Sequence, residues 1–165
     1  MIATWYIVLC AFSAIACAII AGVFLTFSDF VMRSLNKADG IAGVEVMQII
    51  NREVFRTVFM VLLIGMAPLS LALIGYTYFN VSGLASLFII SAGASYIFGV
   101  FAVTLAFNVP MNNRLDAYDP ASPEASAYWA ARYYPRWTAW NHIRTIASAV
   151  AATCFLLGSI WLTQL

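Results

Sequence analysis

The sequence predicts an all-α membrane protein in which four transmembrane helices form an antiparallel bundle. Of its 165 residues, 64% are hydrophobic and only 9% are charged, whereas a soluble domain carries about a quarter of its residues as charged ones. The charges are also confined. Asp, Glu, Lys and Arg are absent before Asp29, between Arg56 and Arg114, and after Arg144. Because about 20 apolar residues cross a bilayer, we expect a single integral-membrane domain over residues 1–165.

The first helix is expected over residues 2–35. Its apolar run lacks a preceding basic residue and is too long for the core of a signal peptide, so we interpret it as a spanning helix. Ala14, Ala18 and Gly22 recur at every fourth position, which indicates a face that another helix approaches closely. The helical pattern breaks over residues 36–40.

The second helix is expected over residues 41–76. Its first half is amphipathic, with Glu45, Gln48, Arg52 and Arg56 along one side. From Thr57 onward it is apolar, and a kink is expected within it at a proline, Pro68.

The third and fourth helices are expected over residues 84–107 and 136–165. Pro110 should end or kink the third helix, because the residue before a proline avoids the α region. Ser122-Pro123-Glu124 combines a capping hydroxyl, a proline and an acid, and it predicts a short interfacial helix over residues 123–134. Pro135 then either kinks this helix into the fourth one or begins the fourth one.

The basic residues predict the orientation in the membrane. All eight lie within the polar segments 29–56 and 108–144, so these segments are expected in the cytoplasm and both termini outside, in the periplasm or extracytoplasmic space. Each half of the chain is then a helical hairpin of the same orientation. A short echo, Gly-Val-Phe at residues 22–24 and 99–101, suggests a parallel pseudo-repeat of the two hairpins.

Amide side chains gather at the polar end of the expected bundle. They are Gln48, Asn51, Asn108, Asn112, Asn113 and Asn141. One interpretation is that they hold neighbouring helices together by hydrogen bonds. The other is that they line an uncharged cavity, rich in donors, that stabilises a phenolate or enolate oxygen.

Two titratable residues at this end could act as a base. His142 is either a structural residue or a proton acceptor that titrates near neutral pH. Asp29 follows the first apolar run and either pairs with a nearby arginine or acts as a desolvated base. A single histidine excludes a bis-His haem or a His-rich metal site within the chain, while His142 with Asp29 and Glu45 stays open as a metal-binding set.

Four aromatic residues and one arginine form a stripe if the last helix continues through Pro135. The stripe consists of Trp129, Tyr133, Trp137, Trp140 and Arg144. It fits either an interfacial belt of aromatic residues or a surface on which a planar ligand stacks.

At these residues the chain resembles the DUF1772 family, also called the anthrone oxygenase family. The matching stretches are GVFLTFSDFVM at 22–32, MQIIN at 47–51, NVPMNNRL at 108–115 and WTAWNHIRT at 137–145. Members with an assigned role oxidise an anthrone to an anthraquinone with molecular oxygen, and no cofactor is generally invoked.

The resemblance implies a role for each candidate residue. His142 or Asp29 would remove the methylene proton, and Arg144 would favour the anion. Asn51, Asn108, Asn112 and Asn141 would hold the substrate oxygens, and Trp137 and Trp140 would stack on the rings. No cofactor and no metal ion are implied.

The expected partners are membrane lipid and an apolar aromatic small molecule. A net charge of +1 suggests no role in nucleic-acid binding. The alternative to an enzyme is a non-enzymatic accessory subunit of a larger membrane complex, and either a homo-oligomer or a membrane-complex partner fits the apolar helix surfaces.

Overall fold

Four long helices build the molecule, as the sequence predicts. The computed structural model describes residues 4–38 and 41–164. Its long helices are long and apolar enough to cross a membrane, so the chain is an integral membrane protein. They span Thr4–Lys37, Val58–Asn80, Gly83–Asp116 and Pro123–Leu162.

These helices contain α-helical, π-helical and 3-10 segments. The first long helix consists of α1 (Thr4–Thr26), the π segment η1 (Phe27–Val31) and α2 (Met32–Lys37). Then come α3 (Ala42–Glu53), the 3-10 turn η2 (Val54–Arg56) and α4 (Val58–Asn80). The third long helix consists of α5 (Gly83–Ala94), the π segments η3 (Ser95–Ala102) and η4 (Thr104–Asn108), and α6 (Val109–Asp116). The fourth consists of α7 (Pro123–Tyr128), the π segment η5 (Trp129–Tyr133) and α8 (Tyr134–Leu162).

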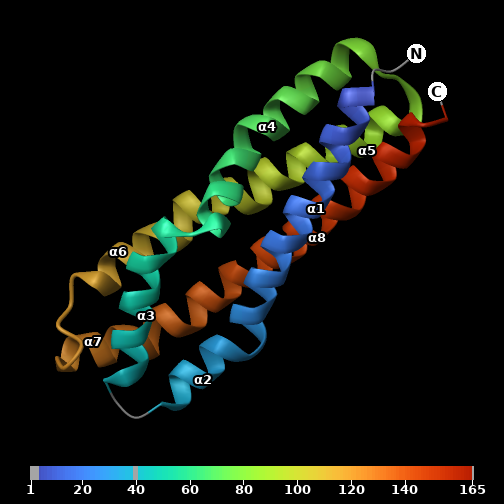
Figure 1. Cartoon of the computed structure of the whole chain (residues 1–165). Coiled ribbons are helices and arrows are strands. Elements are labelled where there is room, and N and C mark those ends of the chain that lie inside the picture. The colour runs from blue at the N-terminus through green and yellow to red at the C-terminus, as the bar shows by residue number, and fades with distance from the viewer. Residues whose placement is uncertain (1–3, 39–40, 165) are drawn as a thin grey trace.

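The bundle has two different ends. Both termini lie at one end, and α2, α3, α6 and α7 lie at the other, which we call the polar end (Figure 1). Between the two ends lies the membrane part, in which α8 packs against α1 and α5, and α4 also contacts α1 and α5. The two polar segments of the sequence therefore meet at the same end.

Close packing in the membrane part occurs at small residues on α5, η3 and α8. A Cβ atom added at Gly99 would lie 2.4 Å from the Cβ of Ala147, and the Ser95 hydroxyl donates to the Ala147 carbonyl at 3.0 Å. The predicted close face of the first helix is wrong, because Ala18 and Gly22 are exposed and only Ala14 of the three is buried. The buried side of α1 mixes small and large side chains: Tyr6, Cys10, Ser13, Ala14, Ala16, Cys17, Ile20 and Phe24.

The expected second helix is two helices. Thr57 has extended backbone angles, φ −109° and ψ 156°, and separates η2 from α4. Its hydroxyl caps α4 by accepting a bond from the backbone N–H of Met60 at 3.4 Å. A threonine at the boundary between a charged and an apolar stretch is an N-cap signal, and the expectation of one helix from 41 to 76 overlooked it.

Two prolines lie just after π-helical turns, and the helices continue through both. Pro110 follows η4 and Pro135 follows η5, each after one intervening residue. A π turn is wider than an α turn, so it offers room for a proline ring that would otherwise clash with the preceding turn. The expected end of the third helix near residue 107 is therefore wrong, and the short helix predicted at 123–134 is the beginning of the fourth long helix.

Local signals set the other boundaries. The predicted Ser122 cap is confirmed, since its hydroxyl accepts a bond from the backbone N–H of Ala125 at 3.1 Å. Gly83 has φ +72° and begins α5. The helical pattern was predicted to break over residues 36–40. In the structure α2 ends at Lys37 and Ala38 is extended, while residues 39 and 40 lie outside the described residues.

The polar end has a core of its own. It buries aromatic and apolar side chains from α2, α3, α6, α7 and α8, among them Met47, Leu115 and Tyr133. Gln48, expected on a polar helix side, is buried and donates to the carbonyls of Leu115 and Tyr118 at 2.8 and 2.9 Å. It therefore satisfies carbonyls at the end of α6 and holds α3 against it.

Candidate functional site

A cavity of about 190 Å³ lies where the polar end meets the membrane part. Its walls come from α1 and η1, from α3, η2 and α4, from η3, η4 and α6, and from α8. The polar side chains that line it are Asn51, Thr104, Asn108, Asn112 and Arg144. The other lining residues are mainly aliphatic or aromatic, and they include Phe24, Phe27, Phe59 and Trp137.

Arg144 is the most unusual group in the cavity wall. Its side chain is buried, at 5% exposure. It donates from Nη2 to Asn141 Oδ1 at 2.7 Å and from Nη1 to Thr104 Oγ1 at 3.3 Å. Its Nε is buried without a hydrogen-bond partner. Its guanidinium carbon lies 4.3 Å from the centre of the Phe24 ring and 5.2 Å from that of the Trp137 ring.

No carboxylate neutralises Arg144 within residues 4–38 and 41–164. The ion pairs found there join Arg33 to Asp29 and Arg52 to Asp116. Charged groups at membrane depth are normally paired, and a buried charge without a partner is strongly unfavourable. An anionic ligand in the cavity would supply the missing counter-charge.

Asn112 joins two aromatic side chains at the cavity wall. Its Oδ1 accepts from the Tyr133 hydroxyl at 2.9 Å and from Trp137 Nε1 at 2.8 Å. Asn51 donates to the same Tyr133 oxygen at 3.3 Å. The network fixes the rings of Tyr133 and Trp137, and it shows that these amides hold helices together as well as line the cavity.

Asn108 presents an unsatisfied acceptor. It is 1% exposed, and its Nδ2 donates to the Trp137 carbonyl at 3.4 Å. Its Oδ1 is buried without a partner. Buried polar atoms of this kind are rare in native proteins, and Asn108 lines the cavity. Within the described residues, the cavity wall therefore combines a buried cation that lacks a carboxylate partner with a buried carbonyl oxygen that lacks a donor.

Asn141 lies behind the cavity and does not line it. It is completely buried and donates to the Phe24 carbonyl at 2.7 Å and to the Ser28 hydroxyl at 2.6 Å. Its oxygen accepts from Arg144. Asn141 thus positions the arginine instead of touching a ligand in the cavity.

The two predicted bases lie outside the cavity. Asp29 is exposed and pairs with Arg33 at 3.0 Å, and His142 is exposed on α8. Each follows a buried residue, Ser28 or Asn141, and one step along a helix turns a side chain by about 100°. The prediction that either residue is a base inside the cavity is therefore wrong. Asp29, Glu45 and His142 also form no metal-binding group in the described part of the chain.

Trp140 also lies apart from the cavity lining. Its ring stacks on that of Phe107, with centroids 3.6 Å apart and 7° between the planes. The rest of the predicted stripe is confirmed as one buried helix face, formed by Trp129, Tyr133, Trp137 and Arg144.

Several residues at the cavity were not among the predicted site residues. Tyr133, which holds Asn112, was placed in the stripe but not in the site, although its position four residues before Trp137 was a usable signal. Phe24 lies in the repeated Gly-Val-Phe but was given no role in the site, and Thr104 and the walls from α4 carried no signal, because single residues of an apolar helix are not distinguishable by pattern.

The cavity opens toward the lipid side of the bundle. Among its lining residues, Phe55 on η2 is 67% exposed, Ile64 on α4 is 53% exposed and Leu105 on η4 is 54% exposed. Because these exposed walls are apolar, the opening between α4 and η4 suits an apolar molecule arriving from the bilayer.

The π-helical segments concentrate around the cavity. Segments η1, η3 and η4 supply lining residues, and η5 supplies Tyr133, which holds Asn112. π turns in helices are often found at functional sites, and here they lie beside the buried arginine and amides.

Fold and site together define a class: a four-helix integral membrane protein with a buried cation in a cavity open to the bilayer. A family model described as "Anthrone oxygenase" matches residues 52–154, more than half of the chain. The chain belongs to the anthrone oxygenase family. The stretches at 108–115 and 137–145 lie inside the match, and those at 22–32 and 47–51 precede it. No curated protein and no solved structure matches the chain.

Proposed function

We propose that the cavity binds a planar phenolic or anthrone-type substrate as its oxygen anion and that the protein oxidises it with molecular oxygen. The observation that carries this proposal is Arg144, a buried guanidinium with no carboxylate partner in the described residues, in the wall of an apolar cavity. Family membership supports the reaction type.

The shape and polarity of the cavity suit such a molecule. Its volume of about 190 Å³ is below the range of roughly 300–1,000 Å³ typical of drug-sized ligands, so it suits a compact ring system or one part of a larger one. The rings of Phe24, Phe27 and Trp137 provide flat apolar contacts. An anionic oxygen of the substrate would lie beside Arg144.

Arg144 would promote the reaction by stabilising the enolate of the substrate. The enol form of an anthrone loses its hydroxyl proton to water, and the guanidinium favours the resulting anion in a poorly solvated site. The electron-rich ring carbon then reacts with oxygen. Overall the methylene carbon loses two hydrogens and gains one oxygen atom, and the second oxygen atom leaves with those hydrogens as water.

We also propose that the polar end faces the cytoplasm and both termini face outward. The support is the position of all eight basic residues in or beside the polar segments. Labelling of single cysteines introduced at Lys37 and at Gln164 in intact cells would test this, since only the Gln164 position should react with an impermeant thiol reagent. Cys10, Cys17 and Cys154 would be replaced by Ala in the background.

The proposed activity is tested with purified protein and anthrone. We expect oxygen uptake, formation of the quinone absorbance, and transfer of one labelled atom from ¹⁸O₂ into the product. Arg144→Met should lower kcat/KM by about 10²–10³-fold, the size seen when one charge-stabilising group is removed. The matched control is Arg56→Gln, which removes an exposed arginine outside the cavity.

Three outcomes would count against the proposal. They are no turnover and no anthrone binding by the wild type, equal turnover by Arg144→Met and the wild type, or equal losses in Arg144→Met and Arg56→Gln. An inactive wild type that copurifies in fixed stoichiometry with another membrane protein would favour the accessory-subunit alternative.

A further inference from the structure

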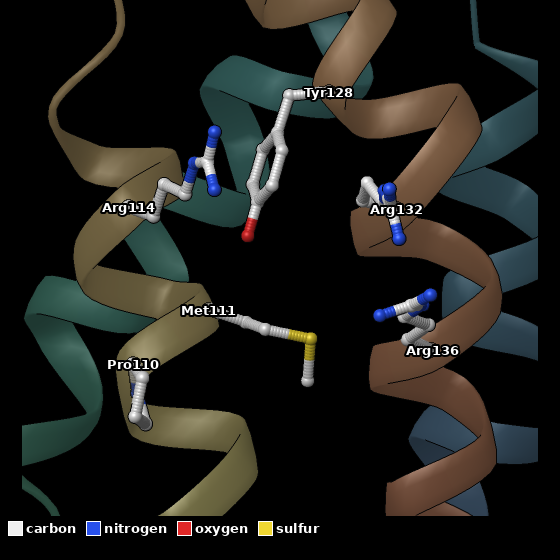
Figure 2. A pocket seen from close by; sticks show the side chains of 6 residues that line it. All are labelled: Pro110, Met111, Arg114, Tyr128, Arg132 and Arg136. Atoms are coloured by element: carbon white, nitrogen blue, oxygen red, sulfur yellow. The ribbon is translucent and has the colours of Figure 1, made fainter.

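A second pocket, distinct from the cavity, lies at the polar end between α6 and the beginning of the fourth long helix. It has a volume of about 360 Å³ and is lined by Pro110, Met111, Arg114, Tyr128, Arg132 and Arg136. Figure 2 shows Arg114 beside the Tyr128 ring on one wall and Arg132 and Arg136 together on the opposite wall, with the Met111 side chain pointing into the space between. It shares no lining residue with the cavity beside Arg144.

The pocket gathers three positive charges, and no acidic residue is among the described residues that line it. Arg132 and Arg136 lie four residues apart and so share a helix face, and Arg114 approaches from α6 across the gap. None of the three is in an ion pair within the described residues. Asp116, the acid nearest to Arg114 in sequence, is bound by Arg52 at 2.7 Å.

The arginine on the α6 side is held in place by aromatic groups. The guanidinium of Arg114 lies 4.9 Å from the centre of the Tyr128 ring, and its Nε donates to the Tyr118 hydroxyl at 3.4 Å. The Tyr128 ring is buried at 8% exposure, while its hydroxyl points into the pocket (Figure 2). Arginine donors and a hydroxyl that face one space fit the oxygens of a phosphate group.

The rest of the pocket lining is apolar, and its position along the helices indicates where it lies relative to the hydrocarbon core. Pro110 and Met111 form an apolar side of the space. About 20 residues cross the hydrocarbon core, so, counted back from Leu162, the core would end near residue 142, and Arg136 and Arg132 would follow about 9 and 15 Å of helix beyond it. Long arginine side chains can extend back toward the headgroups, so arginines here beside an apolar surface suit a phosphate that is attached to acyl chains.

We propose that this pocket binds the phosphate of an anionic phospholipid, with Arg114, Arg132 and Arg136 as its ligands and Pro110 and Met111 against the adjoining chain. A free phosphate compound shares the same recognition chemistry but would leave the apolar side without a partner. The pocket is independent of the proposed oxidation, because none of these residues lines the cavity beside Arg144.

The test is native mass spectrometry of the full chain released from detergent after incubation with phosphatidylglycerol or phosphatidylcholine. We expect the wild type to retain phosphatidylglycerol preferentially. A basic residue near a membrane contributes about fivefold to binding of an anionic lipid, so R114Q/R132Q/R136Q should weaken retention roughly a hundredfold. The matched control, R33Q/K37Q/R56Q, removes the same charge from the same end of the bundle and should retain the lipid.

Two further experiments distinguish a lipid phosphate from a free phosphate and provide a variant to use if the triple variant misfolds. Excess inorganic phosphate should not displace the bound phosphatidylglycerol. Should the triple variant fail to purify, Arg136→Gln alone is expected to lower retention about fivefold. Equal losses in the two triple variants, equal retention of both lipids by the wild type, or displacement by inorganic phosphate would each overturn the proposal.

Discussion

The membrane part and the polar end of this bundle are packed in different ways. In the membrane part, helices approach through small residues such as Gly99 and Ala147, and the core is apolar. Its buried tyrosines, Tyr6 and Tyr96, donate to backbone carbonyls of α4. At the polar end, helices are joined by side chains far apart in sequence, including Asn51, Asn112 and Tyr133.

The difference separates what holds the bundle together from what equips it for chemistry. Small-residue contacts in the membrane part bring backbones close and stabilise the fold by dispersion. Four buried side-chain atoms in the described residues lack partners: Ser70 Oγ and Ser148 Oγ in the membrane part, and Asn108 Oδ1 and Arg144 Nε in residues that line the cavity. Only the cavity pair includes a charged group, and a charged group left without a partner is the more costly kind.

The largest expected effect is on catalysis at Arg144. Arg144→Met should lower kcat/KM by about 10²–10³-fold. The free energy of unfolding should fall by no more than about 1–3 kcal/mol, because the loss of the bond to the buried Asn141 Oδ1 is offset by replacing a buried, unpaired charge with an apolar chain. Turnover and denaturant unfolding in the same detergent would measure both. A loss of stability of several kcal/mol would mean that Arg144 is mainly structural.

The reverse pattern is expected at Gly99. A Cβ atom there would lie 2.4 Å from the Cβ of Ala147, which cannot rotate away, so the helices must separate. Gly99→Ala should lower the free energy of unfolding by about 2 kcal/mol, within the range found for overpacked cores. Gly65→Ala is the control, since nothing lies within 4 Å of that position. Equal unfolding midpoints for the two variants would contradict the close approach of η3 and α8.

A pair of tyrosines sharpens the contrast further. Tyr96 donates to the Leu63 carbonyl at 2.7 Å in the membrane part, and Tyr133 donates to Asn112 at 2.9 Å near the cavity. Tyr96→Phe removes one buried hydrogen bond and Tyr133→Phe removes two, since Tyr133 also accepts from Asn51, and each bond is worth about 1 kcal/mol of stability. Only Tyr133→Phe should also change the KM for anthrone, because it frees Asn112 and Asn51 at the cavity wall. The measurement is turnover of anthrone by each variant, corrected for the fraction of folded protein. Equal losses in Tyr96→Phe and Tyr133→Phe would contradict the prediction.

The smallest expected effect concerns the exposed candidates for a base. His142→Gln and Asp29→Asn should each alter kcat/KM by no more than about twofold, since a true general base contributes about 10²–10⁴-fold. Steady-state rates across a range of pH would check this. A hundredfold loss in either variant would restore that residue as the base and reject a reaction centred on Arg144 alone.

The sequence by itself determined the four spans and the position of the polar end. Charges are confined to two segments, and burying a charge in lipid is unfavourable enough to fix where spans begin and end. The amides Asn51, Asn108 and Asn112 and the arginine Arg144 were also recognisable as a group, because polar residues are conspicuous in an apolar chain. Their meeting at one cavity follows from two hairpins of like orientation.

Only the tertiary structure decided which helix faces are buried and which polar groups have partners. In a span that is apolar all round, no hydrophobic side indicates the interior, and the fit of side chains between helices selects the face. That is why Gly22 is open while Gly99 is packed against Ala147, and why Asn141 is buried while the adjacent His142 is exposed. Among the described residues, the absence of a carboxylate beside Arg144 is likewise a property of the assembled bundle, since it depends on where Asp29 and Asp116 find other arginines.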